Sequence, residues 1–177
     1  MDALIQYTIP VRGLGLGVHQ FEFQIDHNFF QHFEQSPVQD GNIELKFTFD
    51  KRSDMFVLQF DFEGTVKTDC DRCLEAIDLP IKDNQQLLVK LSTEEQKEDA
   101  DIVYVSPEIS QLNVAKYAYE FICLSLPLIK VYDCENDENR ACNPEMLNYL
   151  NNENKEDTPE NEQNPIWEEL KKFNTEK

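Results

Sequence analysis

The segment IELKFTFDKRSDMFVLQFDF, residues 43–62, contains two strand patterns joined by a turn. In residues 43–49 apolar side chains alternate strictly with polar ones, and residues 56–62 repeat the alternation. A period of two residues is that of a strand with one buried face. Residues 50–54 are polar and turn-like, so we predict an antiparallel hairpin whose phenylalanines line one core.

The same alternation predicts further strands outside this hairpin: residues 21–25, 77–81, 87–91 and 102–105. A short helix is expected over residues 26–35, with Asp26 as its N-cap. A long helix is expected over residues 110–126, where a wide apolar surface would press on the sheet and Pro127 would end it. We therefore predict an α+β fold, a mainly antiparallel sheet or partly closed barrel with one long packed helix.

The tail has a different composition. Residues 151–165 carry no aliphatic or aromatic side chain, and a segment that can bury nothing remains disordered. We predict a single domain over residues 1–150, a flexible acidic tether over 151–165 and a short amphipathic helix over 166–177. The apolar stripe of that helix is a candidate partner-binding surface, although the helix could equally dock on its own domain; the stripe is Ile166, Trp167, Leu170 and Phe173.

The chain is strongly acidic. Sixteen basic and thirty-five acidic residues give a net charge of −19, which disfavours direct binding to the phosphates of nucleic acids and favours a basic protein partner. The N-terminus lacks the pattern of a signal peptide, and the longest apolar stretch, residues 121–129, is too short for a membrane helix. We expect a cytoplasmic protein without membrane contact.

Cysteine spacing is the strongest chemical signal. Cys70 and Cys73 are separated by two residues, the spacing that lets two sulfurs face one tetrahedral zinc ion. Cys134 and Cys142 are separated by seven, so they would have to lie at the meeting ends of a loop. Thiols stay reduced in the cytoplasm, so we predict a structural zinc site with these four ligands and take Cys123, inside the expected long helix, as a core residue.

Other chemistry is weaker. A redox-active Cys70/Cys73 pair is an alternative, but a low thiol pKa usually requires a helix N-terminus, and this pair follows a strand pattern. The glycine run at residues 13–17 precedes a strand pattern and does not match a phosphate-binding loop. We find no nucleophile motif, and predict a non-enzymatic protein with no catalytic residues and no small-molecule substrate.

Several segments together carry a resemblance to a known family: Cys70-Asp71-Arg72-Cys73-Leu74, the helix end at residues 120–127, the later Cys134 and Cys142, and Asn164-Pro165-Ile166-Trp167. The chain resembles the YceD-like proteins of bacteria and plastids from about Tyr7 to Phe173. The C-x-R-C element is the most specific part of that resemblance.

The resemblance implies a role in biogenesis of the large ribosomal subunit and in accumulation of 23S rRNA. In bacteria the family's gene commonly adjoins that of ribosomal protein L32, which is small and very basic. An acidic companion of L32 would explain the net charge, so the expected partners are L32 or the large-subunit rRNA. An interaction adaptor unrelated to ribosomes, using the Trp167 helix, remains a further alternative.

Overall fold

A computed structural model describes residues 3–34, 36–92, 102–132 and 142–153 of the chain. The chain divides into two compact units, residues 1–142 and 143–177.

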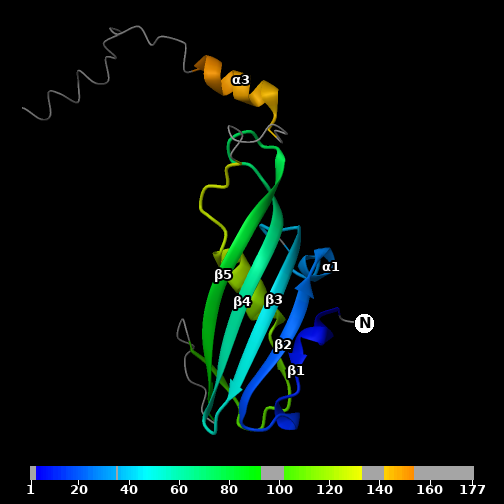
Figure 1. The fold of residues 1–177 in the computed structure, drawn as a ribbon, viewed down its shortest axis with the longest axis vertical. Coiled ribbons are helices and arrows are strands. Elements are labelled where there is room, and N and C mark those ends of the chain that lie inside the picture. Colours follow the sequence, from blue (N-terminus) through cyan, green and yellow to red (C-terminus); the bar gives the residue numbers. More distant parts are fainter. Residues whose placement is uncertain (1–2, 35, 93–101, 133–141, 154–177) are drawn as a thin grey trace, which may run out of the picture. The chain divides into compact units, whose positions relative to one another are not determined.

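The first unit is built on a five-stranded sheet with the order β2-β3-β4-β5-β6 (Figure 1). The strands are β2 (Gly17–Ile25), β3 (Asp40–Lys51), β4 (Met55–Asp69), β5 (Ala76–Leu91) and β6 (Ile102–Val105). Strands β2 to β5 form an antiparallel meander, and β6 runs parallel to β5. The α+β class and the hairpin over residues 43–62 are thereby confirmed. The barrel alternative is wrong, because β2 and β6 form two separate edges of the described sheet.

Strand β5 differs from the prediction in being one continuous strand rather than two. The polar residues 82–86 interrupt the apolar alternation, but they pair in unbroken register with residues 59–63 of β4. Backbone hydrogen bonds of a ladder do not depend on side-chain polarity, so a long neighbouring strand extends β5 through the polar stretch.

The core lies on one face of this sheet. Phe47, Phe49, Phe56 and Phe60 are fully buried, as the alternation predicts. Helix α2 (Ala115–Leu124), yellow-green behind the sheet in Figure 1, packs there through Phe121, whose ring lies 5.1 Å from that of Phe60.

Helix α2 is shorter than predicted, beginning at Ala115 instead of residue 110 and ending at Leu124 instead of residue 126. The residues before it form strand β7 (Leu112–Asn113), which pairs with β1 (Thr8–Ile9). The Asn113 Oδ1 accepts a hydrogen bond from the Ala115 N–H at 2.9 Å and so begins the helix. The residues expected to start the helix are therefore in a strand instead, because they pair with residues more than one hundred positions away in the sequence.

The N-terminal elements close the core beside β2. Two 3₁₀ turns, η1 (Ala3–Tyr7) and η2 (Val11–Gly13), flank β1. Helix α1 (His27–Phe30) is a single turn, and its predicted cap is confirmed because the Asn28 N–H donates to Asp26 Oδ1 at 3.0 Å. The chain turns away at residues 31–34, so the predicted helix over residues 26–35 is too long.

In the second unit, the described part is helix α3 (Pro144–Glu153), which the sequence did not predict. Its N-terminus is capped by Asn143 Oδ1, which accepts from the Glu145 N–H at 3.0 Å, and Pro144 occupies the first helical position. Helix α3 includes residues 151–153 of the predicted tether. The rest of the tether and the helix expected over 166–177, with Ile166, Trp167, Leu170 and Phe173, lie outside the described residues. No helix in the described part of the chain is long and apolar enough to span a membrane.

Candidate functional site

The loop between β4 and β5 brings Cys70 and Cys73 together; we call residues 70–75 the cysteine turn. Its ends are closed by the Cys70 N–H, which donates to Glu75 O at 2.9 Å. Inside it, the Leu74 N–H donates to Cys70 O at 2.9 Å, and Leu74 has a left-handed φ of 57°. This conformation, rare for leucine, reverses the chain directly after the second cysteine. Both cysteine side chains are buried in the resulting turn.

The sulfur of Cys70 accepts hydrogen bonds from backbone N–H groups of the turn and of a second segment. Burial by itself raises the pKa of the Cys70 thiol, but backbone N–H groups of Tyr132, Cys73 and Arg72 donate to its sulfur and outweigh that effect. The pKa of Cys70 consequently lies below its usual value, because hydrogen bonds to the charged form favour it. A buried sulfur with several N–H donors is suited to exist as a thiolate, the form that binds a metal.

A second segment is fixed against the cysteine turn; we call residues 128–132 the strap. The Asp71 N–H donates to Lys130 O at 2.7 Å, and the Lys130 N–H donates to Asp71 Oδ2 at 2.6 Å. The ammonium of Lys130 also donates to Thr68 Oγ1 at 3.2 Å and lies 3.7 Å from Asp71 Oδ1. This clamp brings the backbone of Tyr132 to the sulfur of Cys70.

The other three cysteines lie in different surroundings from the Cys70 and Cys73 pair, or outside the described residues. Cys142 is buried and disulfide-bonded. Cys134 lies outside the described residues. Cys123 is on α2 as predicted, where burial raises the pKa of its thiol. Among the described residues no three metal-binding side chains are assembled, so of the four predicted ligands the structure brings together the Cys70 and Cys73 pair.

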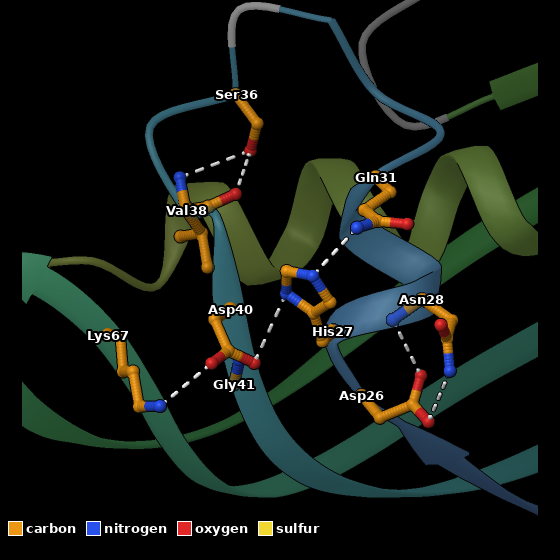
Figure 2. A network of polar contacts seen from close by, with 9 residues as sticks. All are labelled: Asp26, His27, Asn28, Gln31, Ser36, Val38, Asp40, Gly41 and Lys67. Carbon is orange, nitrogen blue, oxygen red and sulfur yellow. Dashed lines mark hydrogen bonds and ion pairs between the residues drawn. The ribbon is translucent and has the colours of Figure 1, made fainter.

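A polar network links α1, the start of β3 and the end of β4 (Figure 2). Lys67, near the end of β4, donates to Asp40 Oδ2 at 2.8 Å, and His27 Nδ1 lies 3.7 Å from Asp40 Oδ1. The hydrogen bond from Lys67 lowers the pKa of the Asp40 carboxyl. The ring of His27 in turn contacts the Gln31 amide at 2.7 Å. These contacts join α1 and the start of β3 to β4 at Lys67, three residues before the cysteine turn begins.

A cavity of about 270 Å³ lies between this network and the clamp. Its lining includes Asp40 and Lys67 from the network, Thr68 and Lys130 from the clamp, and Asp69 at the end of β4. A wider hollow of about 590 Å³ lies over β3, β4 and β5, where Lys82 is paired with Glu63 at 2.7 Å. Two aspartates and two lysines balance in the smaller cavity, whereas four carboxylates and two lysines line the wider hollow.

Sequence reasoning found the Cys70 and Cys73 pair but missed the groups that fix it. Lys130 and Asp71 are 59 residues apart, and neither stands in a recognisable motif. The backbone N–H of Tyr132 leaves no trace in the residue pattern. The one available signal was Pro127, which ends the helix and sends the chain toward the turn.

We expect the Asp71→Ala substitution to release the strap. It removes the acceptor of the Lys130 N–H, a charge-assisted bond at a partly exposed site, and should cost about 1 kcal/mol of stability. Amide exchange at Lys130 should become markedly faster. Glu63→Ala is the matched control, because the exposed Glu63 side chain on β4 makes an equally short bond to Lys82 that is not part of the clamp. If amide exchange at Lys130 is equal in the two variants, the clamp is contradicted.

Comparison with protein families gives a match over most of the chain. The family model described as "Large ribosomal RNA subunit accumulation protein YceD" matches residues 58–174. This range is about two thirds of the chain and contains the cysteine turn, the strap and both later cysteines. Comparisons with curated proteins and with solved structures found no match.

Proposed function

Since this chain belongs to the YceD family of large ribosomal RNA subunit accumulation proteins, we propose that it is a biogenesis factor of the large ribosomal subunit that supports accumulation of 23S rRNA. The family match over residues 58–174 is the observation that carries the proposal. The factor acts by binding rather than by catalysis, since the family is described by the accumulation of an RNA and not by a reaction.

The partner it contacts is a basic ribosomal protein, with L32 as the first candidate. A net charge of −19 repels the phosphates of rRNA and attracts a cationic protein. Complementary charge speeds encounter, and an acidic protein bound to a basic one screens it from premature contact with RNA. The RNA effect is thereby indirect, through delivery or protection of a ribosomal protein.

A structural zinc site held by Cys70, Cys73, Cys134 and Cys142 belongs to the same proposal. It is supported by the burial of Cys70 and Cys73 and by the N–H donors that favour a thiolate at Cys70. The Tyr132 backbone reaches that sulfur only two residues before Cys134 in the sequence. Cys142 becomes a ligand only when its disulfide is reduced, as the cytoplasm favours. Bound zinc would join the strap to the cysteine turn.

The proposal predicts loss of the large subunit when the protein is removed. Depletion should lower the ratio of 23S to 16S rRNA, and the tagged protein should retain a basic large-subunit protein in low salt and less of it in high salt. An unrelated protein of similar negative charge serves as the control for non-specific attraction. An unchanged rRNA ratio, together with no basic ribosomal protein retained, would contradict the proposed function.

A further inference from the structure

Large apolar side chains are exposed around the cysteine turn. We call them the apolar rim: Leu74 (66 % exposed), Leu128 (101 %), Ile129 (73 %) and Val131 (40 %). Leu74 belongs to the cysteine turn itself, and the other three belong to the strap. Single exposed apolar residues are common on proteins, but a group of them on neighbouring segments marks an interaction surface.

The apolar rim is held in place. The strap is fixed at Lys130, whose carbonyl accepts from the Asp71 N–H and whose N–H donates to the Asp71 carboxylate. Leu74 is fixed by the bond of its N–H to Cys70 O. These bonds hold the main chain on both sides of Lys130 in a defined position, with Leu128 and Ile129 directed to solvent. An ordered apolar surface loses less conformational entropy on binding than a loose one does.

Carboxylates outnumber cations on and beside the cysteine turn and the strap, although Lys130 of the strap pairs with Asp71 and the half-buried Arg72 lies within the turn. Asp69, Asp71 and Glu75 are exposed on or beside the cysteine turn, and Asp78 is exposed at the start of β5. Lysine or arginine side chains of a partner would be attracted to these carboxylates. RNA phosphates, or a second copy of this acidic chain, would be repelled by them.

We propose that the apolar rim is the docking surface for a basic polypeptide segment of a large-subunit ribosomal protein. An apolar side chain of that segment packs on Leu128 and Ile129, and flanking cations face Asp69, Asp71 and Glu75. The inference rests on the proposed function and says which surface of the protein binds the ribosomal protein.

The test uses the full chain with the double substitution Leu128→Glu and Ile129→Glu. If charge alone drove binding, two added carboxylates would strengthen the binding of a basic partner. Weaker binding by the variant therefore means that the apolar side chains are needed. We expect retention of salt-extracted large-subunit proteins, treated with ribonuclease, to fall at least about tenfold, as loss of central apolar anchors does. Both residues are exposed, so the melting temperature should stay that of the wild type.

The matched control is the double substitution Leu16→Glu and Val18→Glu. These residues are also exposed, at 71 % and 63 %, and the change of charge is the same. Val18 lies in register with Asp50 and Val57, roughly 40 Å along β4 from Asp69. The control should retain the basic proteins as the wild type does.

Other outcomes separate the surface from the function. If the wild type retains a basic large-subunit protein and the Leu128 and Ile129 variant retains it equally, the docking surface is overturned and the proposed function stands. If ribonuclease abolishes retention, or if the variant instead dissociates a dimer in size-exclusion chromatography, the occupant is RNA or a second copy and the inference is overturned. If the wild type retains nothing basic, the proposed partner itself fails.

Discussion

The Gly64→Ala substitution is expected to lower the free energy of unfolding by about 3 kcal/mol or more. Gly64 lies in β4 opposite Ile43 of β3. A Cβ atom at this position would lie 2.7 Å from Ile43 Cα and closer still to the Asn42 carbonyl oxygen. Both obstacles are backbone atoms, so the sheet cannot relieve the clash by rotating a side chain. Urea denaturation should show the loss as a lower midpoint with little change in slope.

Gly15→Ala is the control for this prediction. A Cβ atom there meets nothing within 4 Å, so the change should alter stability by no more than about 0.5 kcal/mol. If both variants unfold at the same urea concentration, β3 and β4 are not packed as closely as the structure has them. The register that joins the cysteine turn to the sheet would then be wrong.

Gly64 also shows where sequence reasoning about the sheet stops. The alternation over residues 56–62 and the strand pattern expected directly before Cys70 belong to one strand, β4, which runs unbroken to Asp69. Beyond Phe62 the strand is maintained by its two neighbours: residues 63–67 pair with β3 on one side and with β5 on the other. Local patterns indicate the two strand segments separately, and only the pairing on both sides shows that they form one strand.

Long-range pairing accounts for the error at α2 as well. Residues 110–114 continue the helical apolar pattern, so a local reading extends the helix through them. In the fold, Leu112 pairs with Ile9 and the Val114 N–H donates to Tyr7 O at 3.0 Å. Tertiary contacts override helix propensity here, and no local window contains both partners.

In the candidate site, too, local sequence patterns predicted some features, whereas others depend on contacts between distant segments. The two-residue spacing of Cys70 and Cys73 predicts a tight turn with both thiols facing inward, and both are buried in such a turn. The clamp between Asp71 and Lys130 joins segments far apart in the chain and therefore needed the fold. The apolar rim was also out of reach, because an exposed Leu128 cannot be told from a core leucine by its neighbours in the sequence.

The Cys70→Ser substitution should remove bound zinc and unfold the site. The proposed four-thiolate site predicts one zinc ion per wild-type chain, purified under reducing conditions, and far less than one in the variant. A structural zinc site contributes on the order of 10 kcal/mol of apparent binding energy at neutral pH. Losing even part of this should lower the melting temperature by more than about 10 °C in a chain of this size.

Cys123→Ser provides the matched control. Cys123 is a partly buried free thiol on α2 rather than in the cysteine turn, so its loss should leave the zinc content at one per chain. A thiol count adds the decisive contrast: four thiols of the wild type should be protected until a chelator is added, and Cys123 should react in either case.

Two results would contradict the zinc proposal, and they mean different things. A metal-free wild type whose Cys70 and Cys73 form a disulfide rapidly and reversibly would give the lowered pKa of Cys70 a redox role instead. A metal-free wild type with five ordinary thiols, and an unchanged melting temperature for Cys70→Ser, would leave the cysteine turn held by its hydrogen bonds and the clamp alone. The apolar rim depends on those same bonds, so the docking proposal survives either result and fails only by its own test.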